Sequence, residues 1–165
     1  MAMTVSTSGI GELEKMLGKL ADKTQEIASK AMYKGAGVMA DGYTKGIDSI
    51  KTEPFHYVAM PEVIGKRYAS PEEKAALIGK TGIAKFQKDT DSVNTLVGIG
   101  PNAGYADVAG KQKAVPLVAR SINSGTSFMH KQPVIRKAIS SSRKAAKAEI
   151  VAEAEKLIDE IMQQK

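Results

Sequence analysis

Residues 133–162 read PVIRKAISSSRKAAKAEIVAEAEKLIDEIM. In this stretch apolar or small side chains recur at steps of three or four residues, which places them on one face of an α-helix. Pro133 suits the first turn of a helix, where its missing N–H is not needed. The sequence therefore predicts a long helix from about Pro133 to Met162. Its buried stripe would consist of Ile135, Ile139, Ser142, Ala146, Ile150, Ala154, Leu157 and Ile161.

A similar stripe near the start of the chain predicts a second long helix, which fades near Ile50. The pattern weakens at Ala21–Thr24, and this predicts a break there into a short and a longer helix. Gly35, Gly37 and Gly42 would each cost about 1 kcal/mol of helix stability relative to Ala, so we expect them to pack closely against a neighbouring element. The stripe consists of Leu13, Leu17, Leu20, Thr24, Ile27, Ala31, Gly35, Val38 and Gly42.

The segment between the first long helix and the first strands has a weaker pattern. Residues 52–70 are interpreted as a loop. Ser70 followed by Pro71 and then by Glu72 and Glu73 is typical of a helix start, so a short helix is predicted there. Residues 52–80 are interpreted as an insertion within one domain, which spans residues 1–165.

The strand signals come next along the chain. Residues 83–88 and 92–99 flank the polar turn Asp89–Asp91, and this pattern predicts a β-hairpin. Val115–Ile122 is interpreted as a third strand, with Pro116 near its edge. The predicted fold class is therefore α+β, with a long N-terminal helix and a long C-terminal helix packed on a small antiparallel sheet.

No residue pattern indicates catalysis or metal binding. The chain has no Cys, and its only histidines, His56 and His130, lie in no triad-like or H-E-x-x-H context. The glycine-rich segment Gly98–Gly104 has the wrong spacing for a phosphate-binding loop. The acidic pairs Glu72–Glu73 and Asp89–Asp91 suit a helix cap and a turn. We therefore expect no enzymatic activity, no metal and no cofactor.

The positive charge is concentrated in one segment. The net charge is +6, yet Val108–Ala148 contains none of the 18 acidic residues of the chain. A partner that reads charge should meet this segment, and it could be an acidic protein surface or the phosphates of a nucleic acid without sequence preference. The nine basic residues of this window are Lys111, Lys113, Arg120, Lys131, Arg136, Lys137, Arg143, Lys144 and Lys147.

Charge also changes along the predicted C-terminal helix. Its first half is basic and its second half is acidic, which is the reverse of what the helix dipole favours. This polarity indicates either a partner outside the helix or a solvated face. The chain has no apolar run of signal-peptide length at Met1–Ser8 and no run long enough to cross a bilayer, so no membrane association is expected.

The C-terminal third contains residues 118–126 (VARSINSGT) followed by residues 132–139 (QPVIRKAI). This pattern resembles the tail-component family of long-tailed phages, the neck or tail-completion proteins. Weaker likenesses occur at Leu13–Leu20 and Gly98–Pro101. In the family a strand ends in a Gly-Thr turn, which Gly125–Thr126 matches. The family's helix start is matched by Pro133, Arg136 and Ala138. Two departures are Asn123–Ser124, where the family usually has an acidic residue, and the insertion at residues 52–80.

The resemblance implies a structural virion protein at the head–tail junction, assembled in the cytoplasm of the bacterial host. It would form a homo-oligomeric ring between the head connector or head-closure protein and the tail tube or tail terminator, with nonspecific DNA contact in the lumen. The alternatives are a tail terminator that caps the tube, or a small nonspecific DNA-binding protein. A hydrolase or transferase is a third reading, which no residue pattern supports. The predicted interface or DNA-facing residues are Arg120, Gly125, Thr126, Lys131, Pro133, Arg136, Lys137, Arg143, Lys144 and Lys147.

Overall fold

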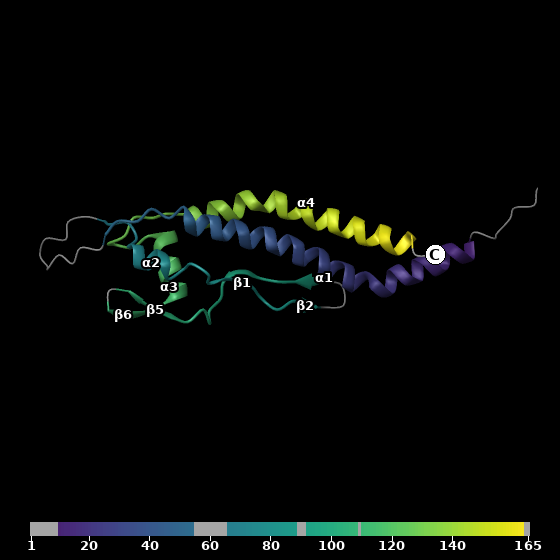
Figure 1. Cartoon of the computed structure of the whole chain (residues 1–165), viewed down its shortest axis with the longest axis horizontal. Helices are drawn as coiled ribbons and strands as arrows, with labels where there is room; N and C mark the ends of the chain where they lie inside the picture. The colour runs from purple at the N-terminus through teal and green to yellow at the C-terminus, as the bar shows by residue number, and fades with distance from the viewer. Residues whose placement is uncertain (1–9, 55–65, 89–91, 109, 164–165) are drawn as a thin grey trace, which may run out of the picture.

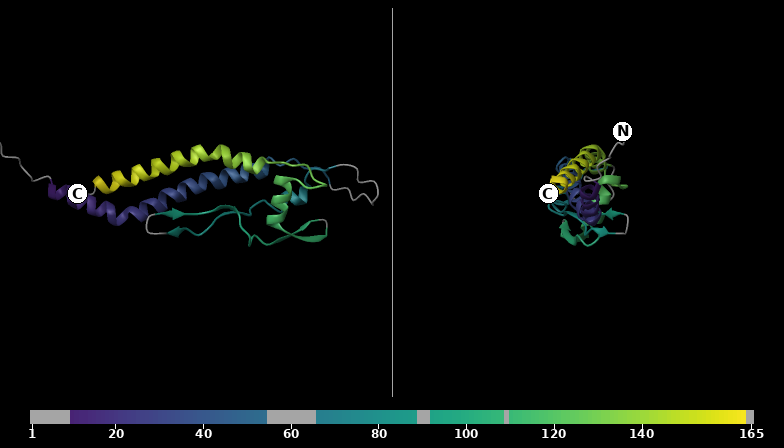
Figure 2. Two further views of the ribbon diagram at one scale, coloured as in Figure 1. Left: turned by 180° about the vertical axis from the view of Figure 1, so that it is seen from behind. Right: turned by 90° about the vertical axis from the view of Figure 1, so that its right-hand side faces the viewer.

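The computed structural model describes residues 10–54, 66–88, 92–108 and 110–163. Two long helices, α1 (Ile10–Asp48) and α4 (Val134–Gln163), run antiparallel along an elongated molecule (Figure 1). The N-terminal end of α1 extends past the C-terminal end of α4 (Figures 1 and 2). Both predicted long helices are confirmed.

The break predicted at Ala21–Thr24 is wrong, because α1 is continuous through this region. The Thr24 hydroxyl donates a hydrogen bond of 2.9 Å to the Leu20 carbonyl oxygen, four residues earlier. A threonine that bonds back to its own helix in this way is accommodated without ending it. The weak apolar stripe therefore reflects lower burial and not a loss of helical structure, since residues 21–26 are exposed.

Small residues allow α1 and α4 to approach closely. A β-carbon at Gly35 would collide with the Ile150 side chain, and one at Gly42 would collide with Ser142. A β-carbon at Gly46 would lie 2.9 Å from the Ile135 α-carbon. The close packing predicted for Gly35 and Gly42 is confirmed, whereas at Gly37 nothing lies within 4 Å of the β-carbon position.

The predicted hairpin packs along α1 and is confirmed. Strand β1 (Thr81–Ile83) pairs antiparallel with β4 (Val97–Ile99), and β2 (Gln87–Lys88) pairs with β3 (Val93–Asn94). Between the two ladders three residues, 84–86, oppose two, 95–96. This extra residue has the character of a β-bulge, which bends a hairpin and increases its twist. The predicted turn at residues 89–91 lies outside the described residues.

The third strand predicted at Val115–Ile122 is wrong, because this segment is helix α3 (Val115–Ser124). Its buried residues are Val115, Val118, Ala119 and Ile122, and their spacing is that of one helix face. Pro116 lies in the first turn, where proline favours a helix. The resemblance implied a strand before Gly125–Thr126, and this expectation is corrected in the same way.

A second hairpin precedes α3 and was not predicted. Strand β5 (Tyr105–Val108) pairs with β6 (Lys111–Ala114), and the Gly110 N–H donates to the Asp107 carboxylate across the turn. The β structure of the described residues is thus three two-stranded antiparallel sheets. Viewed end-on in Figure 2, the long helices form one layer and the strands form the other.

The main core lies where α1 ends. Ile47 and Ile50 pack there with Leu77, and with Val115 and Ile122 of α3. The predicted short helix α2 (Pro71–Ala75) borders this core and is confirmed, including its N-cap Ser70. The core fixes α3 beside the first turns of α4, and this placement creates the surface described next.

Candidate interaction surface

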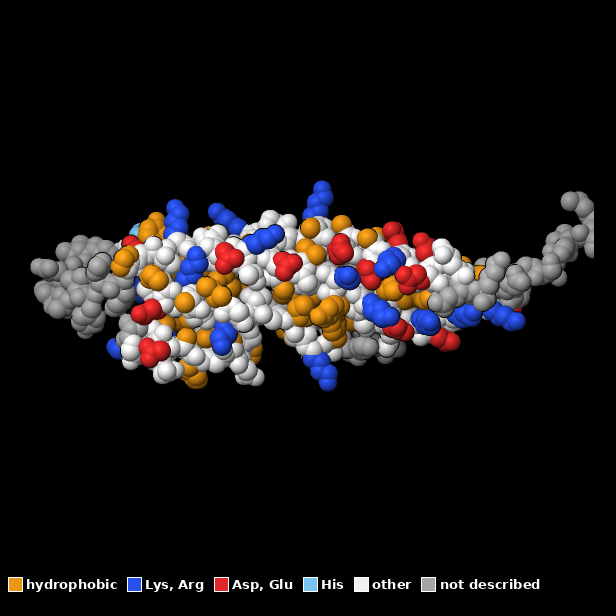
Figure 3. Space-filling view, viewed as in Figure 1, with side chains coloured by type: hydrophobic (Ala, Val, Ile, Leu, Met, Phe, Trp, Pro, Cys, Tyr) orange, Lys and Arg blue, Asp and Glu red, His pale blue; other side chains and the backbone are white. Residues whose placement is uncertain are grey.

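The structure places most of the predicted basic residues on exposed positions of α3 and α4. Arg120 is exposed on α3, and Lys131 is exposed on the connection between the two helices. The remaining five are exposed on the first half of α4, namely Arg136, Lys137, Arg143, Lys144 and Lys147. Figure 3 shows Lys and Arg side chains projecting along the edge formed by the first half of α4.

The five basic residues of α4 occupy two neighbouring sides of the helix. Arg136, Arg143 and Lys147 follow at spacings of seven and four, so they share one side. Lys137 and Lys144 share the adjacent side. Within the described part of the chain, none of these five side chains forms an ion pair. The basic half of α4 therefore carries cations that the described residues leave without ion pairs.

The acidic half of α4 differs from the basic half because residues of opposite charge, two lysines of α1, lie close to it. Lys23 and Lys30 of α1 line a small cavity together with Glu160 of α4. The pKa of Lys30 is raised above its ordinary value by its hydrogen bond and charge interaction with Glu26, and further by Glu160 and Glu153. Glu153 and Glu160, which lie in the half of α4 where the helix dipole disfavours acid, thus have opposite charge nearby within the molecule.

A groove of about 490 Å³ lies between α3 and the start of α4. Arg120 enters its lining from α3 and Arg136 from α4, so the fold brings together two arginines that are 16 positions apart in sequence. Among the described residues, no acidic side chain lines it. The rest of the lining is mainly aliphatic, with Tyr43, Ile99, Pro116, Ala119, Asn123, Ser124, Ile135 and Ile139. We call this feature the arginine groove.

Two polar residues of the arginine groove, Tyr43 and Asn123, are partly buried. Burial raises the pKa of Tyr43, and a backbone hydrogen bond with Ile99 partly opposes that shift. The Asn123 Oδ1 atom is buried and has no hydrogen-bond partner among the described residues. An orphaned acceptor of this kind costs free energy until a donor reaches it.

Gly125 and Thr126 form the turn that leads from α3 towards α4. Gly125 ends α3 with φ +74°, and its N–H donates a 2.8 Å hydrogen bond to the Ser121 carbonyl. The Thr126 hydroxyl accepts a bond of 3.2 Å from the Phe128 N–H. Pro133 is half-buried immediately before α4. These three residues therefore shape the backbone that sets α3 against α4, and the basic side chains extend from that frame.

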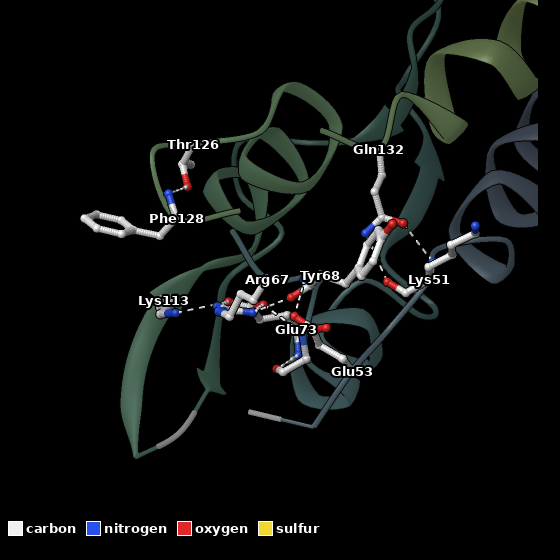
Figure 4. A network of polar contacts seen from close by, with 10 residues as sticks. Lys51, Glu53, Arg67, Tyr68, Glu73, Lys113, Thr126, Phe128 and Gln132 are labelled. Carbon is white, nitrogen blue, oxygen red and sulfur yellow. Dashed lines mark hydrogen bonds and ion pairs between the residues drawn. The ribbon is translucent and has the colours of Figure 1, made fainter. Parts of the chain in front are cut away.

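A buried carboxylate network is a second polar centre, which the sequence indicated only as a helix cap (Figure 4). Glu73 is 3% exposed, and both of its oxygens accept 2.8 Å bonds from Arg67. Ser70 donates its backbone N–H to the same carboxylate at 2.9 Å, and Lys113 approaches it at 3.3 Å. Burial raises the pKa of Glu73. Arg67, the Ser70 N–H and Lys113 together lower it by more, so the pKa lies below its ordinary value.

This network joins segments that are far apart in the sequence. Arg67 precedes α2, and Lys113 comes from β6, so Glu73 links the second hairpin to the helix that borders the core. Nearby, the Gln132 side chain exchanges two hydrogen bonds with the Lys51 backbone, at 2.8 and 3.0 Å. That pair connects the end of α1 to the approach to α4 (Figure 4).

The described residues contain no cluster of three or more metal-ligating side chains. His130 is exposed, and its ring lies 4.9 Å from the Tyr68 ring between centroids; His56 lies outside the described residues. Of the helices described, none combines the length and the apolar character that a membrane span requires. Comparison of the chain with protein-family models, curated proteins and solved structures finds no match.

Proposed function

We propose that this protein is a structural subunit of the head–tail junction of a long-tailed phage, where it works as part of a ring between the head connector and the tail. The observation that carries the proposal is the unpaired charge of α3 and the first half of α4. Exposed cations there form no ion pair within the described chain, while two acidic residues further along the same helix, Glu153 and Glu160, have Lys30 of α1 nearby. Such an imbalance favours contact with a negatively charged partner.

The resemblance of residues 118–126 and 132–139 to the tail-component family supports the same proposal. Both segments border the arginine groove or the basic half of α4. The neighbours would be the head connector or head-closure protein on one side and the tail tube or tail terminator on the other. A tail terminator that caps the tube is the nearest variant of this function.

A small nonspecific DNA-binding protein is the second candidate. The observation in its favour is again the exposed basic surface, which has the charge needed to contact phosphates. This function requires the isolated subunit to bind duplex DNA with an affinity that falls steeply as salt concentration rises.

The deciding experiment is deletion of the gene from the phage or prophage that carries it, followed by electron microscopy of the particles. DNA-filled heads beside unattached tails are expected, and complementation with the wild-type gene should restore joined particles. Abnormal tail length would indicate the terminator variant. Normally joined particles after deletion would overturn the junction role and favour the DNA-binding candidate.

Complementation with the triple variant R143E/K144E/K147E tests the basic half of α4 directly. Heads and tails should stay unjoined, because three cations of the contact surface are reversed. The matched control K34E/K80E/K85E reverses three exposed lysines elsewhere on the molecule and should restore joining. An unchanged yield of infectious particles with R143E/K144E/K147E would remove this part of α4 from the mechanism.

A further inference from the structure

The second half of α4 presents an outward stripe that matches the arginine groove in chemical character. Ala148, Ala152, Glu155 and Asp159 follow at helical spacing and are exposed. Val151, beside them, leaves 54% of its surface exposed. Glu155 and Asp159 form no ion pair within the described part of the chain. We call this feature the acidic stripe.

The two features are complementary in charge and in apolar content. The arginine groove is lined by two arginines and by mainly aliphatic side chains. The acidic stripe offers two carboxylates one helical turn apart, next to small and aliphatic side chains. Arginine and carboxylate groups pair through charge-assisted hydrogen bonds, which are strongest where water is excluded. Each feature thus supplies what the other lacks.

One chain cannot bring its own two features together. Arg136 and Asp159 lie on the same continuous helix, 23 positions apart. At about 1.5 Å of rise per residue, this separation is about 35 Å. Only another molecule can place the acidic stripe against the arginine groove.

We propose that a second copy of this chain inserts its acidic stripe into the arginine groove, with Glu155 and Asp159 facing Arg120 and Arg136. The contact uses different surfaces on its two sides, so it is heterologous and repeats from copy to copy until a ring closes or a filament extends. This inference rests on the proposed function, for which it specifies the contact between ring subunits.

The apolar part of the groove favours a protein occupant over DNA. Its lining is mainly aliphatic, and the phosphate groups of DNA have no apolar surface to bury there. On the second copy, Val151 and Ala152 are exposed beside Glu155, so a protein stripe supplies both the charge and the apolar contact.

The test is analytical ultracentrifugation of the purified full chain over a range of concentrations. At low salt the wild-type protein should associate as its concentration rises. At about 1 M salt, where the Debye length is about 3 Å, association should weaken. The variants R120E/R136E and E155R/D159R should each lower the association constant at least about tenfold. The control K80E/K85E should associate like the wild type, and circular dichroism should show that all variants are folded.

Mixing the two charge-reversed variants gives the sharpest result. In each variant alone the groove and the stripe carry charge of the same sign, so they repel. In a mixture, the reversed groove of one variant meets the reversed stripe of the other, and their charges are opposite. Their remaining surfaces also match, so the mixture should associate although neither component does alone. No gain on mixing, or a wild-type protein that stays monomeric at the highest concentration and low salt, would overturn the inference.

A titration with DNA tests whether DNA, and not a second copy of the chain, occupies the arginine groove. Binding of a short duplex by the wild-type protein that is lost in R120E/R136E would assign the groove to DNA and overturn the inference. These measurements use purified protein, while the proposed function is tested on particles in cells. If subunits fail to associate in this way but deletion still leaves heads and tails apart, the interface is wrong and the junction role stands.

Discussion

Gly46 of α1 lies directly against the backbone of Ile135 in the first turn of α4. A β-carbon at position 46 would lie 2.9 Å from the Ile135 α-carbon and 3.0 Å from the Ala138 β-carbon. A backbone atom cannot rotate away as a side-chain atom can, so this site admits only glycine without a shift of the helices. The contact therefore fixes how closely α1 and α4 approach, next to the groove formed by α3 and α4.

Replacing this glycine should weaken the helix pair. G46A is expected to lower the free energy of unfolding by about 1–3 kcal/mol, the usual effect of overpacking. The matched control is G37A in the same helix, where nothing lies within 4 Å of the new β-carbon. It should raise stability by about 0.5–1 kcal/mol, because alanine favours a helix over glycine. Urea unfolding followed by circular dichroism measures both, and equal effects would contradict the close contact.

The buried carboxylate of Glu73 should contribute more to the free energy of unfolding than any exposed acidic residue does. E73Q removes the charge that receives both Arg67 hydrogen bonds, and the free energy of unfolding should fall by about 2–4 kcal/mol. Glu149 is exposed on α4, so E149Q should change stability by no more than about 0.5 kcal/mol. A small effect of E73Q in the same urea experiment would show that the network contributes little to stability.

The pH dependence of stability should contain a contribution from Glu73. Its pKa in the folded protein lies below the ordinary value of 4.5, so folding favours the ionised form. This stabilisation is fully present above the ordinary value and is lost as pH falls below 4.5 through the folded pKa. The wild type should therefore lose more unfolding free energy than E73Q between about pH 7 and pH 3. Parallel pH profiles of the two proteins would exclude this contribution.

The basic half of α4 should be dispensable for folding. Arg143, Lys144 and Lys147 are exposed and form no ion pair in the described chain, so R143E/K144E/K147E should change the free energy of unfolding by about 0.5 kcal/mol or less per position. Thermal unfolding of the purified variant measures this. A large loss of stability would mean that any defect in particle assembly came from misfolding and not from a lost contact.

Local sequence patterns were sufficient to predict those helices in which periodicity, capping residues and residue propensity all indicate the same structure. The stripes of α1 and α4 and the Ser70 cap of α2 are such cases. The segment Val115–Ile122 was misassigned because its β-branched residues favour a strand, although its buried residues also fit a helix. Pro116 was interpreted as an edge-strand residue, whereas it lies in the first turn of α3.

The sequence was sufficient to predict the positive charge of the candidate site, but not the groove that two of its arginines line. The sequence identifies the basic residues, including Arg120 and Arg136. That these two arginines line one groove depends on α3 being a helix and packing beside α4. Likewise the Ser70–Glu73 cap is a local signal, but Lys113 reaches Glu73 from a hairpin that sequence patterns did not reveal. Such pairings depend on tertiary packing, which periodicity does not specify.

The close pairing of Gly42 with Ser142 also bears on how the chain is made. Ser142 follows Gly42 by 100 positions, so the ribosome synthesises the whole of α1 well before α4. At about 5–20 residues per second, this interval lasts on the order of 5–20 s. During it, the apolar stripe of α1 has no native partner from α4 to cover it. Exposed apolar surface favours aggregation and chaperone binding, so the unfinished chain is expected to be more prone to both than the folded protein.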